Sequence, residues 1–203
     1  MIEVKAIIPE GFASNMYLIH SDGEYAVVDP SVSYEDTVSR YPEISGKIKY
    51  VLLTHAHFDH ILEIDSWVNN THAAVLVGKN DKEALSDPHQ NCYAAFCAEN
   101  RGYFGEAESL SDGDEITLGK DTLRVIETPG HTQGSVVYLG YGFILSGDTV
   151  FAMGYGRYDL PGGDYRALFR SIRRICELDG STAVYSGHGE SSTIEKIKMY
   201  LNI

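Results

Sequence analysis

Four side chains of metal-binding type lie within six consecutive residues of the sequence: His55, His57, Asp59 and His60. His55 and His57 are two residues apart, so in an extended segment both imidazoles point to the same side and can face one ion. Asp59 and His60 follow at the predicted start of a helix, where the backbone turns and can direct them to a second ion. Crowding these groups without a cation would be unfavourable, so the spacing favours a metal site over a solvated polar loop.

Three more candidate ligands stand in turns that directly follow predicted strands. His131 comes after a Pro-Gly pair, which fixes a sharp turn and the direction of the side chain. Asp148 follows a glycine after an apolar strand, and its two carboxylate oxygens can bridge two cations. His188 has a glycine on each side, which allows close backbone approach. Each of these alone is equally typical of an ordinary turn residue, and only the ordered set predicts a site.

The elements that must position these residues alternate between strands and helices. The apolar run 50–53, just before His55, is typical of a strand buried on both faces. Asp164 is a predicted helix N-cap and Gly180 a helix stop, and residues 192–195 fit a capping box before the last helix. We expect residues 86–109, which lack periodicity, to form a loop or short helices beside the site. The remaining predictions are strands over 2–8, 16–20, 25–29, 74–77, 123–127, 135–139, 143–145 and 182–185, and helices over 34–41, 60–68 and 164–178.

Composition narrows the class of protein. With 203 residues and 43% apolar content, we expect one α/β (α+β) domain spanning residues 1–203. The formal net charge of −13 disfavours a nucleic-acid partner, although a local basic spot can still bind a small anionic substrate. The sequence has neither a long apolar run nor a signal-peptide pattern, so we expect no membrane span and a cytoplasmic location. The three cysteines form no CxxC pair and are expected to be free thiols.

The motifs His-x-His-x-Asp-His, Thr-Pro-Gly-His-Thr, Ser-Gly-Asp-Thr and Gly-His-Gly, in this order from about Asn15 to Thr193, resemble the metallo-β-lactamase-fold superfamily. The resemblance implies a four-layer αβ/βα sandwich of two mixed β-sheets with helices outside and a metal centre at one edge. It also implies that Asp29 corresponds to an early buried aspartate, which can orient a ligand histidine. A turn aspartate that ends a strand is the other interpretation of Asp29.

The resemblance implies a centre of two divalent metal ions. Zinc fits the mixed histidine and aspartate ligands, and iron or manganese fits them too. The implied first-metal ligands are His55, His57 and His131; the implied second-metal ligands are Asp59, His60 and His188, with Asp148 bridging.

Within the superfamily, the segment 154–164 resembles that of the short glyoxalase II-like subgroup, which hydrolyses acyl thioesters of glutathione. Its longer members carry a C-terminal helical domain that helps to bind glutathione, and we expect that domain to be absent here because the chain ends at Ile203. The implied activity is thioester hydrolysis by a metal-bridging hydroxide, with Asp59 orienting the hydroxide. Arg157 is the candidate for binding the substrate, and an exposed ion pair is its other interpretation.

Four other classes compete with the hydrolase. A persulfide dioxygenase-like enzyme with one iron is the main alternative, because the Gly-Arg-x-Asp segment occurs in those relatives as well. A β-lactamase is disfavoured by the missing export signal. A nuclease is disfavoured by the negative charge, and a non-enzymatic binding module would not need an open two-metal site.

Overall fold

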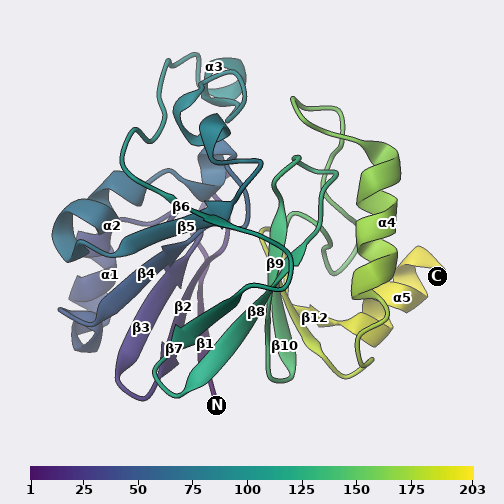
Figure 1. Cartoon of the computed structure of the whole chain (residues 1–203), viewed down its shortest axis with the longest axis horizontal. Helices are drawn as coiled ribbons and strands as arrows, with labels where there is room; N and C mark the ends of the chain where they lie inside the picture. Colours follow the sequence, from purple (N-terminus) through teal and green to yellow (C-terminus); the bar gives the residue numbers. More distant parts are fainter.

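Two mixed β-sheets pack face to face in the computed structural model, which describes residues 1–203 (Figure 1). Each sheet has six strands, and each is built from one continuous half of the chain. The first sheet consists, in spatial order, of β1 (Glu3–Ile7), β2 (Met16–Ser21), β3 (Glu24–Val28), β4 (Ile48–Leu52), β5 (Ala74–Gly78) and β6 (Glu108–Leu110). The second consists, in spatial order, of β12 (Ser192–Thr193), β11 (Ala183–Ser186), β10 (Phe143–Gly147), β9 (Val136–Gly140), β8 (Asp121–Glu127) and β7 (Glu115–Leu118).

Most of the strands that precede the predicted site residues are paired in parallel with a neighbouring strand. Strands β3, β4, β5 and β6 are mutually parallel, and β10 pairs in parallel with β11. The other neighbours are antiparallel. Because parallel strands end at the same edge, the loops after β3, β4 and β5 emerge together, as do those after β10 and β11.

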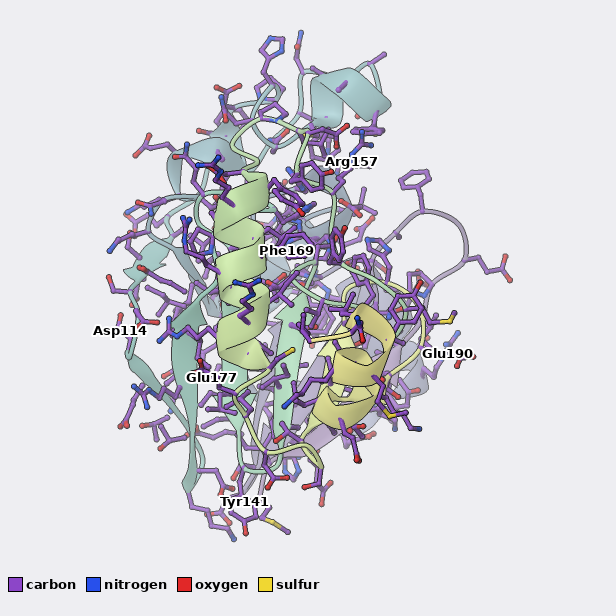
Figure 2. All side chains as sticks on the ribbon, turned by 90° about the vertical axis from the view of Figure 1, so that its right-hand side faces the viewer. Asp114, Tyr141, Arg157, Phe169, Glu177 and Glu190 are labelled. Atoms are coloured by element: carbon purple, nitrogen blue, oxygen red, sulfur yellow. The ribbon has the colours of Figure 1, made fainter.

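Helices cover the outer faces of both sheets (Figure 1). On the first sheet lie α1 (Tyr34–Arg40), a 3₁₀ turn (Pro42–Ile44) and α2 (Ile64–Thr71); on the second lie α4 (Tyr165–Ile175) and α5 (Ile194–Leu201). Figure 2 shows α4 and α5 on the outside of the second sheet, with Arg157 above the N-terminal end of α4. The short helix α3 (Tyr93–Phe96) and 3₁₀ turns at Phe58–His60 and Glu83–Ser86 belong to the site edge. None of the helices has the length and apolar character that crossing a lipid bilayer requires.

Three hydrophobic layers separate the four layers of secondary structure. Side chains alternate along β4 and just beyond it: Val51 and Leu53 pack toward the helices, whereas Leu52 packs between the sheets. Trp67 of α2 fills the first outer layer, and its indole N–H donates to the carbonyl of Val32 at 2.7 Å. The predicted sandwich is confirmed, and so is burial on both faces for Val51, Leu52 and Leu53, whereas Tyr50 is half-buried.

Two helix boundaries differ from the prediction. The helix expected from residue 60 begins only at Ile64, because the chain first makes the 3₁₀ turn Phe58–His60. This turn directs the Asp59 and His60 side chains into the site. The helix expected to reach residue 178 ends at Ile175, and a separate turn precedes β11.

The caps differ in a similar way. Asp164 is confirmed as an N-cap, since its side chain accepts from the N–H of Ala167 at 2.7 Å. The capping box predicted over residues 192–195 is wrong, because Ser192 pairs with Val184 in β12 and Thr193 caps α5 instead. The short edge strand β6 and strand β7 were not predicted; β6 has only three residues, too few to show an alternating pattern.

Candidate metal centre

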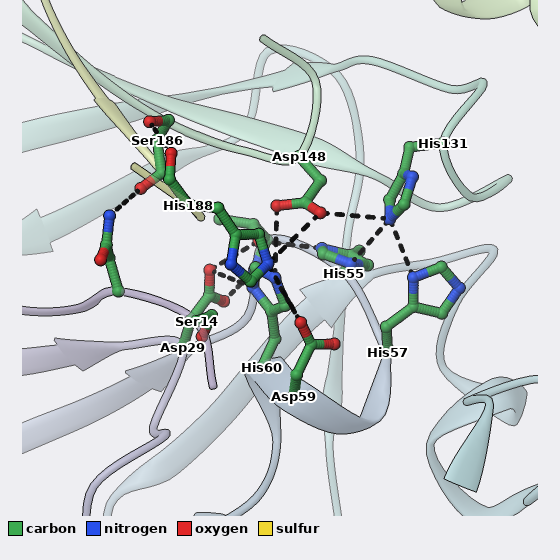
Figure 3. Close-up of polar contacts among 12 residues, drawn as sticks. Ser14, Asp29, His55, His57, Asp59, His60, His131, Asp148, Ser186 and His188 are labelled. Atoms are coloured by element: carbon green, nitrogen blue, oxygen red, sulfur yellow. Dashed lines mark hydrogen bonds and ion pairs between the residues drawn. The ribbon is translucent and has the colours of Figure 1, made fainter. Parts of the chain in front are cut away.

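Turns at one edge of the sandwich bring side chains from both sheets together (Figure 3). The segment 54–60 follows β4, Asp148 follows β10, and His188 follows β11; His131 stands in the turn between β8 and β9. Their ligand atoms form three overlapping groups, in each of which the atoms lie within 4.8 Å of one another. The first group is His55, His57 and His131, the second is Asp59, His60 and His188, and a third, His55, His60 and Asp148, links them. The structure thus gathers all seven predicted residues: His55, His57, Asp59, His60, His131, Asp148 and His188.

The first group consists of three buried histidines. Nε2 of His131 lies 2.8 Å from Nδ1 of His57 and 3.2 Å from Nε2 of His55. On the other side of the His131 ring, Nδ1 lies 2.6 Å from the carbonyl oxygen of Arg157. Because a carbonyl can only accept, Nδ1 must carry the proton, which leaves the Nε2 lone pair free for a cation.

The second group combines imidazoles with carboxylates. Nε2 of His188 lies 3.0 Å from Oδ2 of Asp59, and Nε2 of His60 lies 3.3 Å from Oδ1 of Asp148. Oδ2 of Asp148 is 3.6 Å from both His131 and His188. Asp148 therefore lies between the two groups, where its two oxygens can serve both.

Asp29 is in contact with one of these histidines. Its Oδ2 accepts from Nδ1 of His60 at 2.8 Å and from the hydroxyl of Thr54 at 2.7 Å, while Oδ1 accepts from the N–H of Thr54 at 2.8 Å. Asp29 itself has a φ of 53°, so the chain turns sharply at the end of β3. Asp29 therefore meets both interpretations: it ends a strand at a turn, and it contacts a site histidine.

A second buried carboxylate, that of Asp81, is not predicted by any motif of the sequence. It accepts from the N–H of Ala56 at 3.0 Å, from the hydroxyl of Thr132 at 2.7 Å and from the N–H of Gly134 at 2.7 Å. Asp81 therefore ties the segment that carries His55 and His57 to the turn that carries His131. One signal was available: Asp81 follows β5 closely, just as the ligands follow their strands.

Asn15, whose role no motif predicts either, secures the turn around His188. Its backbone N–H donates to the carbonyl of Gly187 at 2.7 Å, and its side-chain amide donates to the carbonyls of Ser186 at 3.0 Å and Gly189 at 2.9 Å. The hydroxyl of Tyr17 donates to Ser186 as well, at 2.6 Å. The first sheet thereby fixes a turn that belongs to the second.

Burial and charge separate the histidines into two kinds. Desolvation, reinforced by neighbouring imidazoles, lowers the pKa of His57 to about 3 and holds the pKa of His55 well below its usual range. Desolvation also opposes protonation of His60, but Asp29, Asp59 and Asp148 outweigh it and raise the pKa of His60. The neutral imidazoles offer lone pairs, and the three carboxylates supply the negative charge that a cation requires.

Unpaired buried atoms test whether the residues fit a metal ion. Nε2 of His60 and Oδ1 of Asp148 are buried without a hydrogen-bond partner. A buried polar group in this condition is costly, and a divalent cation held between nitrogen and oxygen donors would satisfy both atoms. The donor set suits zinc, iron or manganese. The site therefore fits metal ions.

A cavity of about 400 Å³ opens onto the two groups. His57, Asp59 and His188 line it together with Arg157. The remaining histidines, His20, His72 and His89, lie outside both groups, as expected.

The sequence profile of the Metallo-beta-lactamase superfamily matches residues 9–188, and the chain therefore belongs to this superfamily. The chain is 33% identical to the probable metallo-hydrolase YqgX of Bacillus subtilis, covering 89% of this chain and 87% of YqgX. It is 29% identical to the hydroxyacylglutathione hydrolase GloC of Haemophilus influenzae, covering 95% and 93% respectively.

Among solved structures, the fold matches that of the BLEG-1 B3 metallo-beta-lactamase with a TM-score of 0.88 and 32% identity, covering 98% of this chain and 97% of BLEG-1. The resemblance found in the sequence and the predicted fold class are both confirmed. The superfamily typically binds metal ions, in agreement with the His and Asp groups at the sheet edge.

Proposed function

We propose that this protein is a metal-dependent thioester hydrolase of the glyoxalase II type, acting on a thioester such as an acyl-glutathione. The observation that carries the proposal is the complete set of His and Asp donors beside an open cavity, which is lined by five of them: His57, Asp59, His131, Asp148 and His188. The similarity to GloC, a hydroxyacylglutathione hydrolase, supports the thioester class. The small-molecule substrate and the absence of a nucleic-acid partner are part of the same proposal.

We assign the donors to two divalent metal ions, with zinc as the first choice. In this assignment His55, His57 and His131 would hold the first ion, Asp59, His60 and His188 would hold the second, and Asp148 would serve both. Such ions, when bound, act as Lewis acids on a carbonyl and generate a hydroxide nucleophile near neutral pH.

The chain's own residues would position the reactants. Asp59 lines the cavity, and its carboxylate can accept a hydrogen bond from the attacking nucleophile and so orient it. Arg157 uses Nε and one terminal nitrogen to bind Asp159, both at 2.8 Å, which leaves N–H groups of the guanidinium for a substrate acceptor. A thiolate leaves readily, so the residues need not supply a strong general acid.

Loading the apo-protein separately with zinc and with ferrous iron tests the proposal. Each form receives lactoyl-glutathione and an uncharged acetyl thioester of N-acetylcysteamine, with glutathione persulfide under an oxygen electrode and a β-lactam in parallel. We expect thiol release with zinc and no oxygen uptake in either form. Oxygen consumption that requires iron, with the thioesters intact, would assign a dioxygenase instead. Cleavage of the β-lactam alone would assign a lactamase, and cleavage of only the uncharged thioester would reject glutathione as the carrier.

A further inference from the structure

Three phenylalanine rings form a continuous apolar wall beside the metal donors. The ring centroids of Phe12 and Phe58 are 5.7 Å apart, and those of Phe58 and Phe96 are 5.5 Å apart with nearly parallel planes. Phe12 is 66% exposed and Phe96 is 52% exposed, yet both line the cavity that contains Asp59 and His188. Exposed rings of this size at the mouth of a polar site indicate a binding surface.

The rings come from three separate parts of the fold. Phe12 lies in the connection between β1 and β2, and Phe96 ends α3. Phe58 stands between His57 and Asp59 in the donor segment itself, so the wall reaches the metal donors. Phe151 and Leu160 add further apolar surface to the same cavity.

Apart from its histidines and the metal ions proposed for them, the cavity has one cationic side chain in its lining. Arg157 is the only Lys or Arg that lines it, and its guanidinium already binds Asp159 through two hydrogen bonds of 2.8 Å. The guanidinium carbon also lies 5.8 Å from the centre of the Phe96 ring, so the cation extends the aromatic wall. Arg157 therefore offers an acidic carrier one cationic contact, whereas most of the lining outside the metal donors is apolar.

From these contacts we infer that the cavity selects thioesters with an apolar acyl group, aliphatic or aromatic, which packs against Phe12, Phe58 and Phe96. The inference rests on the proposed thioester hydrolysis and names its substrate class. The acyl side is assigned to the wall because the faces of aromatic rings carry partial negative charge, which disfavours the thiolate that forms on the other side of the scissile bond.

A series of N-acetylcysteamine thioesters on the zinc-loaded protein tests the inference. All members release the same uncharged thiol, so only the acyl group changes from acetyl through butanoyl to hexanoyl and phenylacetyl. We expect kcat/KM to rise about two- to fourfold per added methylene, which corresponds to burial of each methylene against the wall. Calorimetry, which involves no turnover, should show that hexanoate binds more tightly than acetate.

Variants locate the effect. In Phe12→Ser and Phe96→Ser, kcat/KM should rise less steeply with the length of the acyl group, while the metal content is retained. Phe104→Ser is the matched control, since Phe104 is 77% exposed in the same part of the chain but does not line the cavity. If the wild type cleaves the acetyl thioester but has the same kcat/KM for every acyl group, the inference is overturned and the proposed hydrolase activity is retained. Failure to cleave any thioester with two metals bound would overturn both, and an unchanged series in both variants would overturn the assignment to this wall.

Discussion

The imidazole of His60 is held between two aspartates: Nδ1 donates to Oδ2 of Asp29 at 2.8 Å, while Nε2 faces Oδ1 of Asp148 at 3.3 Å. The buried Asp29 carboxylate therefore fixes both the tautomer and the direction of the ring. A carboxylate in this position acts on metal binding through the histidine that it orients.

Replacing Asp29 by Asn should weaken metal binding to the second group while the first group keeps its ion. The amide oxygen can accept only part of the hydrogen bonds that the carboxylate now takes from His60 and Thr54. We expect a loss of about 10- to 100-fold in affinity for one of the two ions, as measured by competition with a chelator. Asp65→Asn, at an exposed position of α2, is the control. Equal weakening of both ions would contradict the assigned grouping.

Replacing His55 by Ala should remove metal and activity together and leave the fold in place, since His55 is buried among the other donors. Elemental analysis of the purified variant gives the metal content, and circular dichroism reports the fold. The control is His72→Asn, because His72 is exposed and its φ of 53° is one that Asn tolerates. Full metal content in the His55 variant would refute the assignment.

Gly187→Ala should disrupt the centre without altering a single donor. A Cβ at this position would overlap Oδ1 of Asp148 and lie 2.6 Å from Cε1 of the His60 ring, so both side chains would have to move. We expect lower metal content and activity. Gly189→Asn is the comparison, since Gly189 has open space around it and a φ of 76° that Asn tolerates. If both variants retain their ions equally, close packing at Gly187 is not required.

Arg157→Ala should lower kcat/KM on anionic thioesters about tenfold, the effect of losing one charge-assisted hydrogen bond. The variant also leaves Asp159 without its partner. The hydrogen bond from Arg157 now lowers the pKa of Asp159 to about 2, and the carboxylate would remain ionised at neutral pH and repel an anion. Metal content should not change. Unaltered kinetics on every accepted substrate would show that the pair is only a surface ion pair.

Removing the metal ions should destabilise the protein, because each ion binds the folded chain through residues that the unfolded chain cannot hold together. At a free metal concentration one hundred times the dissociation constant, one ion adds about 2.7 kcal/mol to the free energy of unfolding. We therefore expect the Tm to rise with zinc concentration and to fall on chelation. A Tm that does not change with zinc concentration would contradict the presence of a metal site in the folded protein.

The donors could be found from the sequence because most of them stand one to a few residues beyond a strand. Strand ends are signalled locally by apolar runs, and turns are signalled by glycine and proline. Asp81 could not be found in this way, because its partners Ala56, Thr132 and Gly134 become neighbours only when the two sheets pack. Its role is a tertiary contact that leaves no local pattern.

The segment 86–109 was difficult to interpret for a different reason. Here one side chain satisfies backbone groups that a helix or sheet would otherwise pair: the amide of Asn91 donates to the carbonyls of Leu85 and Arg101 and accepts from the N–H of Tyr93. Such side-chain pairing has no periodicity. The expectation of short helices beside the site was nevertheless confirmed, since α3 places Phe96 in the cavity.

Each sheet is one continuous half of the chain, and the halves meet in sequence only at residues 111–114, between β6 and β7. Both donor groups draw on both halves, since His131 completes the first and His188 completes the second. A chain cleaved at this crossing would yield two fragments, each with all six strands of one sheet and neither with a complete set of donors. Bound cations would then act as non-covalent cross-links, and the free metal concentration would set how tightly the two fragments associate.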